Sequence, residues 1–215
     1  MKPHRIHQLI AEGENEHLDF KFEIADSRKI AKTFVAFANS GGGKLLIGVK
    51  DNGVIAGIRT EEEKYMAEAA AAMYCSPNVL FETREWNIKG KVVLEVTIPE
   101  GNEKPYFMQN EHNSWLAYIR VGDENILANK IIVNAWKRKS RPEGTYINYS
   151  HKEKLLLEYL ESNDTISLSK FRNLAGISQH SAENILINFL ALDILDFQVI
   201  DKQFFYSLSN TFGSE

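Results

Sequence analysis

Residues 35–49 read VAFANSGGGKLLIGV, and the turn residues 51–53 (Asp-Asn-Gly) follow them. A helical pattern ends at the glycines and an apolar strand begins after them. Gly41 permits the left-handed backbone that closes many helices, and Gly42 or Gly43 lets the chain reverse tightly into the strand. An Asp-Asn-Gly turn after an apolar run is typical of a hairpin. The stretch therefore predicts a helix, a glycine turn, a strand and a hairpin turn in succession.

Further motifs surround this stretch on both sides. Upstream lie Glu14 and residues 18–21 (Leu-Asp-Phe-Lys), and downstream lie residues 104–106 (Lys-Pro-Tyr) and 118–123 (Tyr-Ile-Arg-Val-Gly-Asp). Taken in this order, the motifs resemble the Schlafen-type AlbA-like domain, a nucleic-acid-binding module that is also described as a divergent ATPase-like (divergent AAA) domain. The resemblance covers residues 1–140 and implies a nucleic-acid partner, DNA or RNA.

Hydrophobic periods and turn signals predict a mixed α+β domain over the same residues. Helices are expected at residues 4–12, from residue 27 to the glycines, and at residues 61–74 and 128–139; strands are expected at residues 18–23, 45–49, 54–57, 79–88, 92–98 and 115–121. We therefore expect a mixed sheet flanked by helices.

A polar linker at residues 141–150, broken by Pro142 and Gly144, separates this domain from a smaller one at residues 151–215. The smaller domain is expected to contain helices at 152–162, 167–175 and 179–192, then strands at 197–200 and 204–208. Three helices followed by a hairpin resemble a winged helix-turn-helix.

Composition limits the class of protein. The chain has 215 residues, of which 44% are hydrophobic and 25% charged, as in ordinary globular proteins. No apolar run is long enough to cross a bilayer, and the first residues lack the apolar core of a signal peptide. The single cysteine, Cys75, excludes an intrachain disulfide. We expect a cytoplasmic protein with no membrane segment.

Charge is distributed unevenly between the two parts. Residues 1–149 carry 20 Lys and Arg against 20 Asp and Glu, and residues 150–215 carry 5 against 9, so the net charges are 0 and -4. Neither part has the basic excess of a dedicated nucleic-acid binder, so phosphate contacts require a local patch. The candidates are Lys21, Arg120 and the run Lys137-Arg138-Lys139. In the alternative interpretation, the run only complements the dipole at a helix C-terminus.

The glycine-lysine segment invites an ATP-binding interpretation, which the spacing excludes. A P-loop follows a strand, opens a helix, has glycine five places before its Gly-Lys pair, and has Ser or Thr after that pair. Here Ala38 occupies the distant glycine position, Leu45 follows Lys44, and the glycines close a helix. We do not expect ATP to bind by this route.

Three acids suggest a different chemistry. Glu14, Asp19 and Asp51 match, position by position, the acidic triad of Schlafen-type ribonuclease cores, with Asp19 one methylene shorter than the usual glutamate. Converging carboxylates can hold Mg²⁺ or Mn²⁺, which supply a nucleophilic water at a phosphodiester. The alternative is that Asp19 lies on a solvated strand face and that Asp51 opens a turn, where aspartate is favoured.

The resemblance implies a nucleic-acid-binding protein. A helix-turn-helix is a frequent companion of such domains, which suggests a DNA-binding transcriptional regulator rather than an enzyme. In the third C-terminal helix, the face without core residues carries no Lys or Arg: Gln179, His180, Glu183, Asn184, Ile187 and Asn188. Without Lys or Arg, this face cannot neutralise DNA phosphates, which argues against direct recognition of DNA bases by this helix. An exposed Ile187 favours dimerisation or partner binding. Two alternatives therefore stay open, a metal-dependent ribonuclease and a dimerisation or partner-binding module that forms a homodimer.

Overall fold

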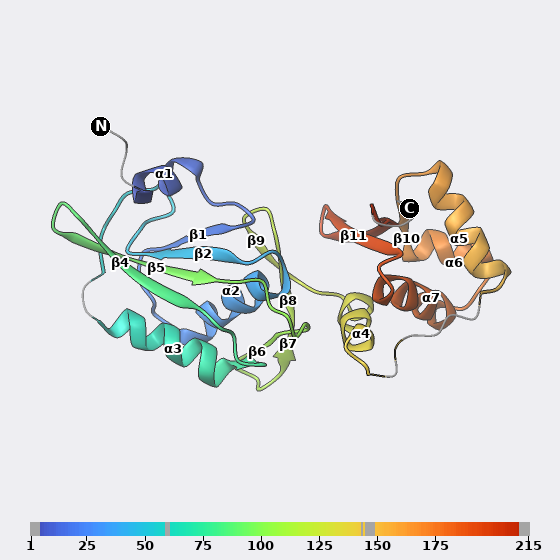
Figure 1. The fold of residues 1–215 in the computed structure, drawn as a ribbon, viewed down its shortest axis with the longest axis horizontal. Coiled ribbons are helices and arrows are strands. Elements are labelled where there is room, and N and C mark those ends of the chain that lie inside the picture. Colours follow the sequence, from blue (N-terminus) through green and yellow to red (C-terminus); the bar gives the residue numbers. More distant parts are fainter. Residues whose placement is uncertain (1–4, 59–60, 143, 145–148, 211–215) are drawn as a thin grey trace. The chain divides into compact units, whose positions relative to one another are not determined.

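A computed structural model describes residues 5–58, 61–142, 144 and 149–210. The chain divides into two compact units, Met1–Ala128 and Asn129–Glu215. Figure 1 shows the helices and strands of both units, and each unit has its own hydrophobic core. None of the helices within the described ranges is long and apolar enough to span a membrane.

The first unit is built on a four-stranded mixed sheet with the strand order β1-β2-β5-β4. Its elements in chain order are α1 (Arg5–Glu12), β1 (Leu18–Lys21), α2 (Ser27–Asn39), β2 (Gly43–Ile47), α3 (Glu62–Tyr74), β4 (Glu82–Ile88) and β5 (Lys91–Ile98). Strands β1 and β2 are parallel and are connected by α2, whereas β5 runs antiparallel to both β2 and β4. The α+β class with a mixed sheet flanked by helices is therefore confirmed.

Short strands complete the first unit: β3 (Cys75–Ser76), β6 (Phe107–Gln109), β7 (Trp115–Leu116), β8 (Tyr118–Val121) and β9 (Glu124–Leu127). The single strand expected at 115–121 is wrong, because Ala117 interrupts it. Its carbonyl accepts from the Ala128 amide, and β7 and β8 belong to different sheets. The strand expected at 54–57 is also wrong: one isolated bridge, Val49 to Ile55, forms there.

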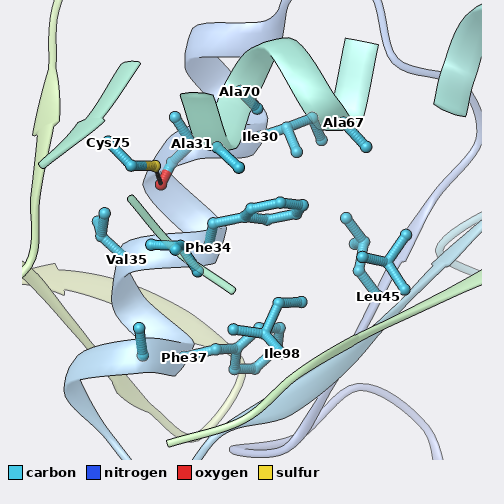
Figure 2. Packing of buried hydrophobic residues seen from close by; sticks show 14 of the residues in the cluster. Ile30, Ala31, Phe34, Val35, Phe37, Leu45, Ala67, Ala70, Cys75 and Ile98 are labelled. Atoms are coloured by element: carbon cyan, nitrogen blue, oxygen red, sulfur yellow. Dashed lines mark hydrogen bonds between the residues drawn. The ribbon is translucent and has the colours of Figure 1, made fainter. Parts of the chain in front are cut away.

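Two apolar layers cover opposite faces of the four-stranded sheet. Alternate residues along β2 point to opposite faces, so Leu45 belongs to the core beneath α2 and α3, whereas Leu46 belongs to the core beneath α1. Figure 2 shows Phe34 of α2 pointing toward Leu45. Cys75 lies in the same larger core, where burial raises the pKa of its thiol to about 12. This cysteine therefore serves packing.

The glycine turn after α2 has a steric origin. Gly42, rather than Gly41, adopts the left-handed conformation, with φ of 72°, and its amide donates to the Phe37 carbonyl at 3.0 Å. A Cβ on Gly42 would lie 2.8 Å from the Ile98 carbonyl oxygen, and one on Gly43 would lie 2.4 Å from the Phe37 ring. The turn is therefore a packing device, as the sequence predicts.

The second unit contains α4 (Lys130–Lys139), α5 (His151–Ser162), β10 (Ile166–Ser167), α6 (Leu168–Ala175), α7 (Gln179–Ala191), β11 (Leu195–Ile200) and β12 (Gln203–Leu208). Its antiparallel sheet has the order β10-β12-β11. The three helices and the hairpin expected between residues 151 and 215 are present, with small shifts in their ends.

Helix α4 differs from expectation in its packing. The sequence interpretation assigns residues 128–139 to the first domain, yet Ile131, Ile132 and Ala135 lie in one core with α7. The α4 N-cap, Asn129, also donates to the Tyr206 hydroxyl at 3.2 Å. The boundary between the two compact units therefore precedes α4, whereas the domain boundary expected near residue 140 follows it. Because the apolar residues of α4 fit both arrangements, the sequence pattern does not distinguish them.

Candidate functional site

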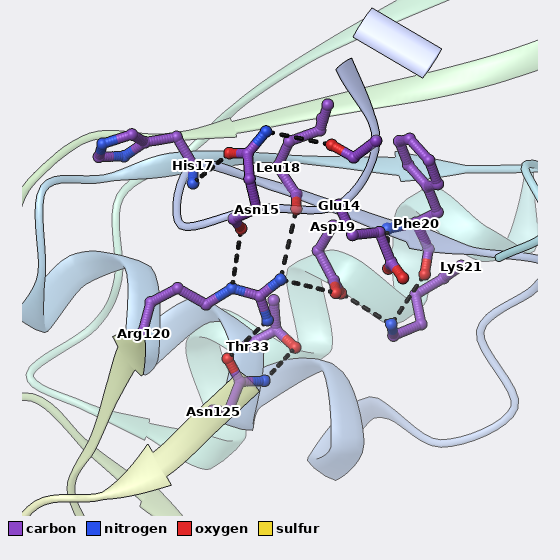
Figure 3. Close-up of polar contacts among 11 residues, drawn as sticks. Glu14, Asn15, His17, Leu18, Asp19, Phe20, Lys21, Thr33, Arg120 and Asn125 are labelled. Carbon is purple, nitrogen blue, oxygen red and sulfur yellow. Dashed lines mark hydrogen bonds and ion pairs between the residues drawn. The ribbon is translucent and has the colours of Figure 1, made fainter. Parts of the chain in front are cut away.

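The centre of the candidate site is a buried ion pair between β1 and β8. Arg120 Nη2 lies 3.1 Å from Asp19 Oδ1, and the two side chains are 1% and 5% exposed. The same guanidinium donates to the carbonyls of Asn15 and Leu18 and to Asn125 Oδ1 (Figure 3). A phosphate contact requires an accessible guanidinium, so Arg120 acts as a positioning residue, and its expected role as a direct phosphate contact is corrected.

Glu14 closes the outer edge of the same strand. Strand β1 is an edge strand, and the Phe20 amide, which points away from β2, donates to Glu14 Oε1 at 2.8 Å. Burial raises the pKa of Glu14, and the neighbouring Asp19 carboxylate raises it further. The carboxyl therefore satisfies an edge amide that water or another strand would otherwise take.

Lys21 supplies the second cation at this point. Its Nζ lies 2.7 Å from Asp19 Oδ2 and 2.7 Å from the Phe20 carbonyl, while its side chain stays 37% exposed. The Asp19 carboxylate thus lies between a buried guanidinium and a partly exposed ammonium group. The alternative interpretation of Asp19 as part of a solvated strand face is wrong, since the residue is 4% exposed.

The acidic trio does not form a metal centre. Asp51 is exposed in the turn beyond β2, whereas Asp19 lies within β1 opposite Leu45. Across the described ranges, no group of three or more His, Cys, Asp or Glu side chains could hold a metal ion. Since two cations already compensate Asp19, the residues as they lie do not fit Mg²⁺ or Mn²⁺.

Two residues of the opening stretch join the separate motifs. Asn39 Nδ2 donates to the carbonyls of Tyr106 and Tyr118 at 2.8 and 2.9 Å, and Asn39 Oδ1 accepts from the Tyr106 amide at 2.8 Å. Ser40 Oγ accepts from the Arg120 amide at 2.9 Å. Sequence reasoning missed both residues. The signal that could reveal them is a pair of polar residues where an apolar helix ends, because the buried one, Asn39, must find hydrogen-bond partners.

The predicted basic run lies at the end of α4 and is partly engaged within the second unit. Arg138 donates to Asn188, and Lys139 Nζ lies 2.5 Å from Asp193 Oδ1. Lys137 and Lys139 are exposed at the helix C-terminus. These contacts agree with the alternative of a charged helix end, and the exposed ammonium groups keep a phosphate role open as a proposal.

Helix α4 also changes the interpretation of α7. Glu183 and Ile187, both expected to point outward, are 5% and 4% exposed. Lys130 of α4 pairs with Glu183 at 2.6 Å, and Ile187 lies in the core shared with α4. The expected exposed Ile187 is therefore wrong, because α4 covers that side of α7. The polar residues that stay at least partly accessible are Gln179, His180, Asn184 and Asn188.

The first unit thus defines a class of α+β domain in which a glycine turn and a buried Asp-Arg pair join distant signature motifs. The family model described as Schlafen, AlbA_2 matches residues 14–129, more than half of the chain. The chain belongs to this family. The match ends at the boundary between the two compact units.

Two solved structures are similar to this chain at low identity. The DIP2311 protein from Corynebacterium diphtheriae is 15% identical with a TM-score of 0.48, over 73% of this chain and 39% of that one. The N-terminal domain of an ATP-dependent DNA helicase RecG-related protein from Nitrosomonas europaea is 19% identical with a TM-score of 0.41, over 69% of this chain and 99% of that one. This chain therefore spans well under half the length of the DIP2311 protein. Comparison with the curated proteins gives no match.

Proposed function

We propose that the chain is a nucleic-acid-binding protein whose Schlafen AlbA_2 domain binds DNA or RNA without cleaving it. Family membership supports a nucleic-acid-related role. The observation that carries the distinction between binding and cleavage is the double compensation of Asp19 by Arg120 and Lys21. A carboxylate compensated in this way repels phosphate less and has little charge left to attract a divalent ion.

Phosphate contacts in this proposal come from accessible cations. Lys21 is 37% exposed, and Lys137 and Lys139 are exposed at the end of α4. Each phosphate neutralised by one of them releases condensed counterions, so affinity must fall as salt rises.

The test measures binding and cleavage together. Duplex DNA, single strands of DNA and RNA, and transfer RNA are titrated against a salt series, with Mn²⁺ or with a chelator. We expect salt-dependent binding that is the same under both conditions, and no cleavage product. For the triple variant Lys137→Ala/Arg138→Ala/Lys139→Ala, the salt slope should flatten by about one counterion for each lost contact.

The control for the ribonuclease alternative is Asp51→Asn, which keeps the size of the turn residue and removes one charge. If wild-type protein cleaves RNA with Mn²⁺ and this variant does not, the chain is a nuclease and the proposal fails. A saturable Mn²⁺ site in calorimetry of the wild type at millimolar metal counts against the proposal in the same way.

For the second unit we propose a winged helix-turn-helix and, with it, a role in transcription regulation. The order of α5, α6, α7 and the β11–β12 hairpin supports this assignment. Because α4 covers one side of α7 and its partly accessible residues are uncharged amides and a histidine, partner binding or a homodimer is the second candidate for this unit. Light scattering of the full chain over a concentration series tests the homodimer, since a strict monomer excludes it.

A further inference from the structure

One face of the four-stranded sheet is only partly covered. Helix α1 lies on the side opposite α2 and α3 (Figure 1), and its apolar residues cover the core around Leu46 and Val93. The rest of that face is a polar hollow, here called the open sheet face, lined by residues of α1, β2, β4 and β5: Arg5, Lys44, Glu82, Thr83, Arg84, Glu95 and Thr97. A concave surface with converging polar groups is the usual form of a binding site.

Glu95 is a buried carboxylate that accepts hydrogen bonds from two cations of the open sheet face, Arg5 and Lys44. Its carboxylate is 3% exposed and accepts from Arg5 Nη2 at 3.2 Å, Lys44 Nζ at 2.8 Å and Trp86 Nε1 at 2.7 Å. Burial opposes ionisation, but the hydrogen bonds from Lys44 and Trp86 lower the pKa of Glu95. Unlike Arg120, these cations reach the surface: the Arg5 side chain is 51% exposed and that of Lys44 is 26% exposed.

Arg84 adds a flat stacking plane to the open sheet face. Its guanidinium carbon lies 4.1 Å from the centroid of the Trp86 ring, and the Glu95 carboxylate holds that ring in place. Arg84 is exposed, so a ligand can reach its side chain from solvent. Unpaired bases stack on arginine planes as they do on aromatic rings.

We propose that the open sheet face binds single-stranded nucleic acid, with one unpaired base stacked on Arg84 and the flanking phosphates near Lys44 and Arg5. This inference rests on the proposed function and specifies its ligand. Three cations line the face against two carboxylates, and one of these, Glu95, is buried beneath them. A duplex keeps its base faces stacked inside the helix, so it cannot use the Arg84 plane.

The experiment uses the full chain and a 2-aminopurine-labelled oligonucleotide of about 15 nucleotides, single-stranded or annealed to its complement. We expect the wild type to bind the single strand more tightly and to change the fluorescence of the stacked base. Arg84→Ala should weaken single-strand binding about tenfold, the loss of one stacked base. Arg84→Lys, which keeps the charge without the plane, should retain the salt slope and lose the fluorescence change. Lys29→Ala, an exposed cation on α2, is the matched control and should behave as the wild type.

The possible failures separate the two proposals. If Arg84→Ala binds single strands as the wild type does, or if it weakens duplex and single strand equally, the open sheet face is not the site, while the proposed function stands. If the wild type binds no nucleic acid at low salt, both proposals fail. Photocrosslinking of a bromouridine oligonucleotide to the wild type gives an independent readout: adducts on β4 support the site, and adducts confined to the second unit overturn it.

Discussion

At the scale of single residues, the signature positions of this chain serve mainly to join distant segments. The Asp19–Arg120 pair links β1 to β8, and Asn39 links the end of α2 to the backbone of residues 106 and 118. Because these polar groups are buried, one that is left without its partner should destabilise the fold. A family signature can therefore reflect the requirements of the fold rather than of catalysis.

Arg120→Gln tests this residue-scale role. Removing the guanidinium leaves the buried Asp19 carboxylate with Lys21 alone, so we expect the first unit to lose about 3–5 kcal/mol of unfolding free energy. The measurement is urea denaturation followed by tryptophan fluorescence and circular dichroism. The double variant Asp19→Asn/Arg120→Gln removes both charges and should recover part of the loss. A single variant that unfolds at the wild-type midpoint would show that the pair contributes nothing to stability.

At the scale of elements, the packing of α4 differs from the packing expected from the sequence. It closes the core of the second unit through Ile131, Ile132 and Ala135 and pairs Lys130 with Glu183. Without α4, the side of α7 that carries Ile187 would lose its cover. The helix therefore lies in the compact unit Asn129–Glu215.

Two fragments test the role of α4. The fragment 129–215 should give a cooperative thermal transition, whereas 150–215 should be less stable or aggregate because Ile187 and Glu183 lose their partners. Calorimetry and light scattering of both fragments provide the measurement. Equal transition temperatures for the two fragments would contradict the assignment of α4 to this core.

At the scale of the whole molecule, the compact units and the family match divide the chain at nearly the same residue. The open sheet face and the Asp19–Arg120 pair both lie in the first unit, where residues 1–128 carry 15 Lys and Arg against 19 Asp and Glu, whereas residues 129–215 carry 10 against 10. The net charge of -4 on the first unit should oppose the approach of nucleic acid except where cations cluster, as they do on the open sheet face.

The fragment 1–128 tests whether the nucleic-acid site lies in the first unit. We expect it to fold alone and to retain the single-strand binding of the full chain within a few-fold, with a shallower salt slope if Lys137 and Lys139 contribute in the full chain. Fluorescence anisotropy of the fragment and of the full chain on the same oligonucleotide provides the measurement. Binding that resides in 129–215 instead would transfer the nucleic-acid site to the second unit.

Elements whose signals are local can be predicted from the amino-acid sequence alone. Hydrophobic period, caps and turn residues predict several elements: the helix that ends at the glycine turn, the strand after it, the β4–β5 hairpin and the three C-terminal helices. The exclusion of a P-loop also follows from sequence order alone. In each case, the physical cause acts within a few residues along the chain.

Which polar side chains meet follows from the three-dimensional packing and not from local sequence. Asp19 and Arg120 are 101 positions apart, and no local pattern states that they pair or that Asp51 stays away from them. The same holds for α4, whose apolar residues fit either unit until packing selects α7. Hydrophobic period indicates which face of an element is apolar, but the partner of each side chain depends on how all the elements pack together. In this chain, Asp19 forms an ion pair, Glu14 caps an edge amide and Asp51 lies in a turn.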